Sequence, residues 1–265
     1  DQAAYDFLIQ AMGGLMSVPG ERDDKPGGGP QKVGIPIVDL MTGMYAAVSI
    51  LGALAQRERT GRGEAIDIGM LDVQVAMLSN QAMNYLVSGK APRRNGNAHP
   101  NIQPQDVYTC ADGDVVLVVG NDGQFAKLCE VLSCAQWATD VRFATNAQRV
   151  RNIAVLSGLL REQLLQWQRH RLIAALDDAG VPCGPINDVA GALEDPQVRA
   201  RQMLLHMPHA SGAQVPQIAS PIRFGQAPSH AQTPPPLLGQ HSDEVLAELG
   251  YGAAEISALR AAGAI

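Results

Sequence analysis

The longest apolar run of the chain lies between Lys32 and Arg57, and it contains a single charged side chain, Asp39. A run of this length suits either a helix that spans a membrane or a helix in a protein core. Two hydroxyl side chains, three glycines and a proline interrupt it, and a charge inside a spanning helix costs about 3 kcal/mol on insertion scales. We therefore expect a buried helix of a soluble protein over residues 40–59, and no membrane partner.

The composition is that of a folded, acidic protein. Hydrophobic residues make up 46% and charged residues 17% of the 265 residues, which allows a substantial core in one large domain or two ordinary ones. The net charge of −6 does not provide the basic surface that nucleic-acid binding requires. We expect no nucleic-acid partner, although a small anionic ligand needs only a local basic cluster.

Neither the cysteines nor the histidines indicate a metal site or disulfides. The four cysteines are Cys110, Cys129, Cys134 and Cys183. They form no CxxC pair, which is typical of free thiols in a reducing compartment, and we see no signal peptide. His206 and His209 are three residues apart, but no cysteine or carboxylate nearby completes a ligand set. We expect a cytoplasmic protein without a metal.

Hydrophobic periodicity and turn residues divide the chain into elements. Helices are predicted over 5–16, 40–59, 72–87, 124–132, 153–166, 170–179, 189–205, 243–249 and 253–262. Strands are predicted over 64–71, over 107–110 and 115–120 around an Asp-Gly turn, over 181–186, and over 214–224, which is too rich in proline for a sheet centre. The polar segment 90–105 resembles a linker or a functional loop. This order predicts a compact α+β insert between helical segments.

Asp39 is the sharpest candidate for chemistry. A helix N-cap is the simpler interpretation, because aspartate fills that position well. The functional interpretation uses the same geometry, since a carboxylate at a helix start meets the positive end of the dipole and free N–H groups while apolar neighbours remove its water. A desolvated carboxylate is a competent nucleophile, and nearby N–H groups could stabilise an oxyanion. The residues alone leave both interpretations open.

Two other carboxylates stand out. Asp6 follows Tyr5 near the start of the chain, and the two form a second candidate pair. Asp122 lies in VVGNDGQF, where the second strand of the hairpin ends. For Asp122 the simpler interpretation is a turn residue between Gly120 and Gly123.

Six segments, in order along the chain, resemble the class III CoA-transferase family, also known as the CaiB/BaiF type. They are VDLMTGMYAAVSILGAL, RERTGRGEAIDIGMLD, GNAHPNI, VGNDGQF, GVPCGPI and PLLGQHSDEVLAELGY. The resemblance runs from Tyr5 to Ile265, and six ordered matches are far more specific than a single motif. The family includes formyl-CoA transferase, carnitine CoA-transferase and alpha-methylacyl-CoA racemase.

The resemblance implies that Asp39 is the nucleophile. The family's catalytic aspartate lies in a D-x-x-T/S-G-x motif, which here runs from Asp39 through Gly43. In the family this aspartate attacks an acyl-CoA thioester, becomes an aspartyl-CoA thioester through a mixed anhydride, and passes CoA to an incoming carboxylic acid. CoA is a substrate, and no metal or organic cofactor is needed. The family's AYE segment, whose tyrosine and carboxylate belong to the active site, matches Ala4-Tyr5-Asp6.

The resemblance also implies an active-site loop. Its residues here are Asn95, Gly96, Asn97, Ala98, His99, Pro100 and Asn101. This differs from the glycine run of formyl-CoA transferase and looks more like family members that use succinyl-CoA and other dicarboxylic acids. Arg93 and Arg94 precede the loop and are candidates for binding the phosphates of CoA.

The fold implied by the resemblance is α/β, with a Rossmann-like large domain and an inserted small α+β domain. Residues 1–88 would be the large-domain portion with Asp39, residues 89–190 the small domain, and residues 191–265 a return segment with the C-terminal helices of the large domain. Two chains of the family interlock, so we expect a homodimer. The Rossmann half that precedes the AYE segment in the family is absent here, so we expect a fragment, a truncated reading frame or half of a split protein whose activity requires the missing portion.

Two alternatives to a CoA-transferase stay open. One is a racemase of the same family, although the racemases have a histidine at the place of Tyr5 and a glutamate at the place of Asp122. The other is a non-catalytic remnant that acts only in dimerisation or binding.

Overall fold

The computed structural model describes residues 3–225 and 233–265, and its contacts divide the chain into two units, Asp1–Ile186 and Asn187–Ile265. The second unit begins close to the predicted boundary after residue 190. The other predicted boundary, after residue 88, lies inside the first unit and stays a prediction.

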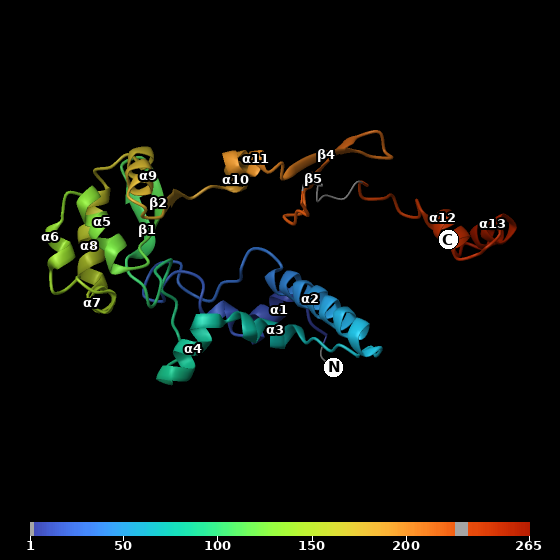
Figure 1. Ribbon diagram of the computed structural model, residues 1–265, viewed down its shortest axis with the longest axis horizontal. Coiled ribbons are helices and arrows are strands. Elements are labelled where there is room, and N and C mark those ends of the chain that lie inside the picture. Colours follow the sequence, from blue (N-terminus) through green and yellow to red (C-terminus); the bar gives the residue numbers. More distant parts are fainter. Residues whose placement is uncertain (1–2, 226–232) are drawn as a thin grey trace. The chain divides into compact units, whose positions relative to one another are not determined.

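The first unit begins with helices that carry the candidate nucleophile. They are α1 (Asp6–Met12), the short 3-10 helix η1 (Leu15–Ser17), α2 (Ile37–Thr60), α3 (Met70–Met77) and α4 (Ser79–Ser88). Helices α1, α2 and α3 pack against one another (Figure 1). The helix predicted over 5–16 ends earlier because Gly14 adopts a φ of 82°, and a Cβ on Gly13 would lie 2.2 Å from Cγ of Gln74 on α3. Gly13 therefore permits the close approach of α1 and α3.

The rest of the first unit is a small α+β domain around one core. A three-stranded antiparallel sheet has the order β1 (Gln105–Cys110), β2 (Gly113–Val118), β3 (Cys183–Pro185). The helices are α5 (Asp122–Val131), α6 (Gln136–Thr139), α7 (Asn146–Arg151), α8 (Ile153–Leu164) and α9 (Arg169–Asp178). The predicted hairpin is confirmed, with Cys110 opposite Gly113.

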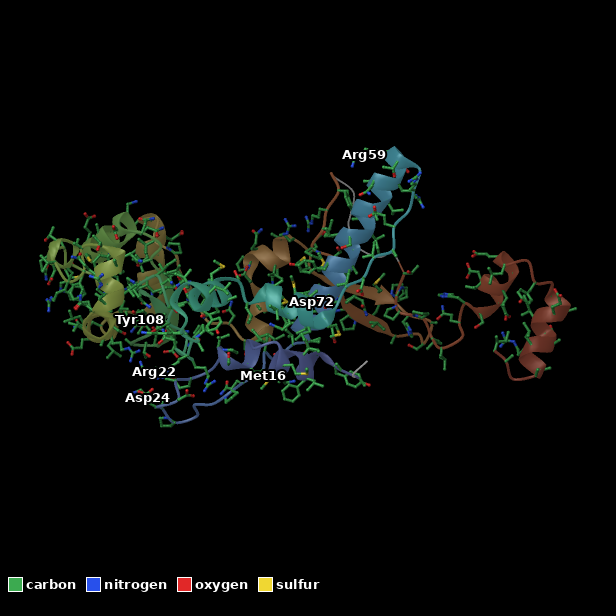
Figure 2. The ribbon with its side chains drawn as sticks, turned by 90° about the horizontal axis from the view of Figure 1, so that it is seen from below. Met16, Arg22, Asp24, Arg59, Asp72 and Tyr108 are labelled. Carbon is green, nitrogen blue, oxygen red and sulfur yellow. The ribbon has the colours of Figure 1, made fainter. Side chains whose placement is uncertain are left out.

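Alternation along the hairpin explains the core of this domain. Tyr108 and Cys110 on β1, and Val115 and Leu117 on β2, are buried, while their neighbours along each strand are less so. Side chains two residues apart point to the same face of a sheet, and this face packs against α8 and α9. Figure 2 shows Tyr108 within this domain.

The second unit consists of short elements. They are α10 (Val189–Glu194), α11 (Pro196–Ala200), β4 (Leu204–Pro208), β5 (Gln214–Ile218), α12 (Ser242–Glu248) and α13 (Ala253–Ala261). The helix predicted over 189–205 is wrong in its extent, because Asp195 caps α11 through the N–H of Gln197 at 2.8 Å and Pro196 cannot continue α10. The chain then enters β4. The strand predicted over 214–224 is confirmed in its first part as β5, an edge strand of a two-stranded sheet, whereas the strand ends at Ile218.

Three other predictions about local structure are wrong. Residues 64–71 form no strand, because no strand in the described parts of the chain pairs with them. The helix predicted over 72–87 divides into α3 and α4 at Leu78, next to Ser79 with a φ of 47°. Helix α2 is not a buried helix, since Val38 is the one residue of it that is buried.

The exposure of α2 is the most unusual property of the first unit. Val48 is 65% exposed and Leu51 is 66% exposed. By length and composition the helix could cross a membrane, and Figure 2 places Arg59 in the charged last turn. The described residues cover little of its apolar surface.

Candidate functional site

Asp39 occupies the first turn of α2. The N-cap residue is Pro36, so the interpretation of Asp39 as the N-cap is wrong, and Asp39 is the third residue of the helix. Its side chain is exposed, and among the described residues the structure gives its carboxylate no hydrogen bond or ion pair. A carboxylate here benefits from the positive end of the helix dipole.

The amides of this first turn have distinct partners. The N–H of Ile37 donates to the carbonyl of Ile35 at 2.8 Å, and that of Leu40 to the carbonyl of Pro36 at 3.1 Å. The N–H of Val38 donates to Oδ1 of Asp6 at 2.8 Å. Within the described residues, the N–H of Asp39 has no acceptor. One unpaired amide therefore lies next to the candidate nucleophile.

Asp6 and Gln10 connect α1 to the start of α2. Nε2 of Gln10 donates to Oδ2 of Asp6 at 2.7 Å, and the N–H of Val33 donates to Oε1 of Gln10 at 2.9 Å. Gln10 is fully buried and Asp6 is 9% exposed. Gln10 was not among the residues predicted from the sequence, although its spacing of four residues from Asp6 places both on one face of a helix.

Among the described residues, the Tyr5 side chain makes no hydrogen bond to the polar cluster of Asp6 and Gln10. It is 86% exposed, and its carbonyl accepts the N–H of Ile9 at 3.1 Å as α1 begins. Among the described residues, its hydroxyl has no recorded partner. The structure therefore brings Asp6, but not the Tyr5 side chain, into hydrogen-bonded contact with α2.

The motif residues that follow Asp39 have different environments. The hydroxyl of Thr42 donates to the carbonyl of Val38 at 2.7 Å, which is a local bond within the helix. Gly43 is exposed, and a Cβ added to it would meet no atom within 4 Å. Residues four apart lie on one helix face, so the space above Gly43 adjoins the Asp39 side chain.

The predicted active-site loop is held together by its own polar groups. Nδ1 of His99 accepts the N–H groups of Asn101 and Ile102, both at 3.1 Å. The side chains of Asn101 and Asn84 exchange two hydrogen bonds of 3.0 Å. Gly96 adopts a φ of 61°, a conformation that side chains disfavour.

Arg93 and Arg94, the two candidates for binding the phosphates of CoA, differ in their partners. The guanidinium of Arg94 pairs with Asp23 and also donates to the carbonyl of Ser17 at 3.3 Å. Arg93 is exposed and has no recorded partner among the described residues. Arg93 is therefore the freer of the two cations.

A hollow of about 670 Å³ lies beside the loop. Asn95, Gly96 and Asn97 line it together with residues of the 21–26 segment and of α8. Its cationic side chains are Arg22, Lys25 and Arg161. Figure 2 shows Arg22 beside Asp24, to which it donates two hydrogen bonds of 2.8 Å. The charge of Lys25 also acts on the Asp24 carboxylate, and Arg161 lies 4.0 Å from Asp106.

Asp122 is a structural anchor in the small domain. It is the first residue of α5, so the turn interpretation is wrong, and Asn121 is the N-cap. Its Oδ1 accepts from Nη2 of Arg149 at 2.8 Å and from the N–H of Asn146 at 2.9 Å. Arg149 was not predicted from the sequence, because one arginine on a polar helix gives no sign that it is fully buried.

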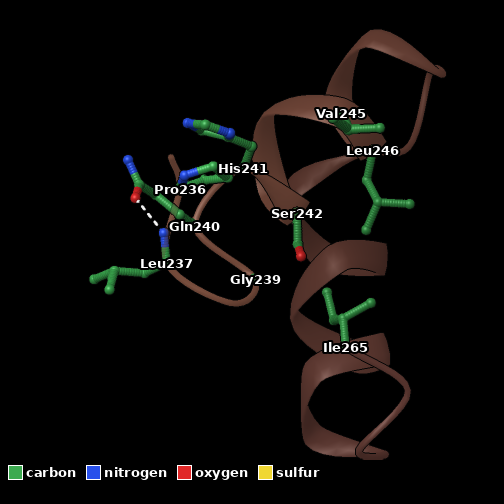
Figure 3. A pocket seen from close by; sticks show the side chains of 9 residues that line it. All are labelled: Pro236, Leu237, Gly239, Gln240, His241, Ser242, Val245, Leu246 and Ile265. Carbon is green, nitrogen blue, oxygen red and sulfur yellow. Dashed lines mark hydrogen bonds between the residues drawn. The ribbon is translucent and has the colours of Figure 1, made fainter. Parts of the chain in front are cut away.

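A second hollow, of about 410 Å³, lies in the second unit (Figure 3). The residues that line it are Pro236, Leu237, Gly239, Gln240, His241, Ser242, Val245, Leu246 and Ile265. The N–H of Leu237 donates to Oε1 of Gln240 at 2.8 Å. None of the candidate site residues lies here.

The other candidate ligands provide no additional site. All four cysteines are free thiols, and burial raises the pKa of Cys129 to about 12 and that of Cys183 to about 11. Among residues 3–225 and 233–265 no three acidic, histidine or cysteine side chains form a metal-binding group. His230 lies outside the described residues.

Comparison with known proteins identifies the class. The model of CoA-transferase family III matches residues 1–242, and the chain belongs to this family. The mixed α/β fold with small sheets matches a CaiB/BaiF family protein from Brucella suis, with a TM-score of 0.74 and 46% identity over 94% of this chain and 63% of that one.

Two relatives are named as CoA-transferases that act between succinate or succinyl-CoA and glutarate. The chain is 43% identical to succinate–glutarate CoA-transferase of Agrobacterium fabrum, over 94% of this chain and 61% of the relative. It is 34% identical to human succinyl-CoA:glutarate CoA-transferase, over 100% of this chain and 60% of the relative. The chain therefore spans about three-fifths of the length of these relatives.

Proposed function

We propose that this chain carries the catalytic portion of a CoA-transferase that moves CoA between a dicarboxylyl-CoA, such as succinyl-CoA, and a dicarboxylic acid. The observation that carries the proposal is Asp39, an exposed and unpaired carboxylate in the first turn of an apolar helix. The named activities of the relatives support the substrate class.

Asp39 acts as the nucleophile in this proposal. Its carboxylate oxygen attacks the thioester carbonyl, the C–S bond breaks, and CoA leaves as a thiolate from a mixed anhydride. The thiolate then attacks the Asp39 carbonyl and releases the donor acid, which leaves an aspartyl-CoA thioester. The acceptor carboxylate attacks this thioester, the C–S bond breaks, and a second mixed anhydride forms between the acceptor and Asp39 with release of CoA thiolate. The thiolate then attacks the acceptor's acyl carbon, which gives the new acyl-CoA and restores the Asp39 carboxylate. No metal or organic cofactor takes part, and CoA is a substrate.

The geometry of α2 supports this chemistry. The positive end of the helix dipole lies at the first turn, where it attracts negative charge, and apolar neighbours reduce the hydration of the Asp39 side chain once substrate covers them. The free N–H of Asp39 is placed to donate to an oxygen that gains negative charge near the carboxyl carbon. Open space above Gly43 leaves room for the thioester on the same helix face.

Asp122 supports a transferase over a racemase. A racemase needs a base with a pKa near the working pH that reaches the carbon-bound proton. Oδ1 of Asp122 accepts the N–H of Asn146 and pairs with Arg149, and a phenol hydroxyl such as that of Tyr5 is a hydrogen-bond donor and a weak general base. Neither side chain is suited to remove a proton from carbon at neutral pH.

We also propose how the exposed face of α2 is covered in the complete protein. A Rossmann-like large domain completed by residues outside this chain, in an interlocked homodimer, would bury the apolar residues of α2. This arrangement favours a cytoplasmic protein without membrane or nucleic-acid partners. Light scattering on the complete polypeptide that contains this chain tests the dimer, and a monomer that is active in transfer would contradict it.

Trapping tests the nucleophile. In the complete polypeptide, succinyl-CoA followed by hydroxylamine should convert Asp39 to a hydroxamate that mass spectrometry detects. Asp39→Asn should abolish both label and turnover. The matched control is Asp72→Asn, because Asp72 is the exposed third residue of the neighbouring helix α3, and this variant should label and turn over normally. Full activity of Asp39→Asn would refute the assignment.

A further inference from the structure

The start of α2 is capped by a side chain from another helix. Pro36, the N-cap residue, has no side-chain hydrogen-bonding group and no N–H. The acceptor that a local serine or aspartate usually provides comes instead from Asp6 on α1, through the 2.8 Å bond to the N–H of Val38. Val38 is the residue directly before Asp39, and it is fully buried.

Gln10 fixes the capping carboxylate in place. Its Nε2 donates to the second oxygen of Asp6 at 2.7 Å, and its Oε1 accepts the N–H of Val33, which lies in the segment that leads into α2. Both oxygens of Asp6 and both polar atoms of Gln10 are thus paired. A buried polar group whose partners are all present resists rotation, because any other rotamer would leave an unpaired group.

From this cluster we infer that Asp6 and Gln10 are positioning residues for Asp39, an inference that rests on the proposed function. The cluster fixes the axial position and rotation of the first turn of α2 relative to α1. It thereby sets the direction of the Asp39 carboxylate and of its free N–H toward the thioester. Neither Asp6 nor Gln10 contacts the substrate in this role.

The burial of Asp6 and Gln10 distinguishes a positioning role from direct participation in the reaction. Asp6 is 9% exposed and Gln10 is fully buried, so neither presents a free oxygen or N–H to a ligand. A displacement of about 1 Å in a reacting group can lower the rate about 100-fold. The structure therefore predicts a loss in the chemical step with little change in substrate binding.

The test uses four variants of the complete polypeptide. Asp6→Asn removes the charge of the capping oxygen, and Gln10→Met keeps the side-chain length but removes both hydrogen bonds. Asp6→Glu restores a carboxylate that can reach Val38 after a change of rotamer. Asp72→Asn again removes an acidic side chain at a helix start, here the exposed first turn of α3.

We expect Asp6→Asn and Gln10→Met to lower kcat about 10- to 100-fold while KM for succinyl-CoA changes less than about threefold. Asp6→Glu should recover most of the lost rate, and Asp72→Asn should match the unchanged enzyme. The rate of hydroxamate formation at Asp39 should fall in parallel with kcat. Circular dichroism at the assay temperature confirms that each variant is folded.

The outcomes distinguish this inference from the proposed function. If the unchanged enzyme forms no hydroxamate at Asp39, the proposed function fails. If the unchanged enzyme forms it and folded Asp6→Asn and Gln10→Met form it at the same rate, the positioning inference fails and the cluster serves stability alone. A new ionisation in the pH profile of kcat in Asp6→Glu would also overturn it, because that result would indicate direct proton transfer.

Discussion

Replacing Arg149 should destabilise the small domain far more than replacing its acidic partner, Asp122. The guanidinium is fully buried and donates to the carbonyl of Gln103 at 2.7 Å and to that of Phe143 at 3.0 Å. It also lies 4.5 Å from the ring centroid of Phe125. The side chain of Asp122 is 55% exposed, so water can solvate its carboxylate when the ion pair with Arg149 is broken, and little stability is lost at this end of the pair.

The magnitude follows from these contacts. In Arg149→Met, two carbonyls lose a charged donor at roughly 1–2 kcal/mol each, and the ring contact adds up to about 1 kcal/mol. The half-exposed ion pair adds less than about 1 kcal/mol. We therefore expect Arg149→Met to lower the free energy of unfolding by about 3–4 kcal/mol, and Asp122→Asn to lower it by about 1 kcal/mol or less.

Intrinsic fluorescence during urea unfolding measures both effects. The chain has two tryptophans, Trp137 and Trp167, and both pack against the small-domain core, so the signal reports this domain. In a double-mutant cycle the coupling between Arg149→Met and Asp122→Asn should stay below about 1 kcal/mol. A loss in Asp122→Asn equal to that in Arg149→Met would refute the reasoning, because the ion pair would then dominate.

Three further predictions concern other parts of the first unit. Gly43→Ala should stabilise isolated α2 by up to about 1 kcal/mol yet lower kcat/KM in the complete polypeptide. Gly52 is equally open but lies on another helix face, so Gly52→Ala should keep its activity. Equal losses of kcat/KM in the two variants would refute a role for the space above Gly43. Burial raises the pKa of the Cys129 thiol to about 12, so as pH rises the thiol ionises first in the unfolded chain. The free energy of unfolding should therefore fall as pH rises above about 8.5. Urea unfolding at pH 8 and pH 10 measures this fall, which should be smaller in Cys129→Ala. Arg93→Gln should weaken CoA binding in calorimetry more than Arg94→Gln, because Arg94 already pairs with Asp23; the reverse order would contradict this assignment.

The parts of the fold that the sequence predicts are those stabilised by local contacts. The hairpin around Asp112–Gly113 and helices α5, α8 and α9 pack into one core, so periodicity and turn chemistry suffice to find them. The segment 64–71 alternates as a strand does but pairs with no strand in the described chain. A strand depends on its neighbour, and periodicity alone does not reveal whether that neighbour is present.

The candidate site likewise combines a feature that the local sequence predicts with a long-range contact that it does not predict. A lone carboxylate at the start of an apolar run was sufficient to single out Asp39, but sequence alone placed it at the N-cap, because aspartate prefers that position. The actual cap comes from Asp6, 32 residues away from Val38, and no local pattern predicts a bond across that distance.

The cap from Asp6 explains how a carboxylate can stay free at the start of an apolar helix. An aspartate that capped α2 itself would have its oxygens bound to the first-turn amides and would be a poor nucleophile. Here Pro36 provides no side-chain cap, Asp6 accepts the N–H of Val38, and Asp39 is left with both oxygens and its own N–H unpaired among the described residues. The division of labour between the two aspartates therefore lets one stabilise the helix start while the other remains available to react.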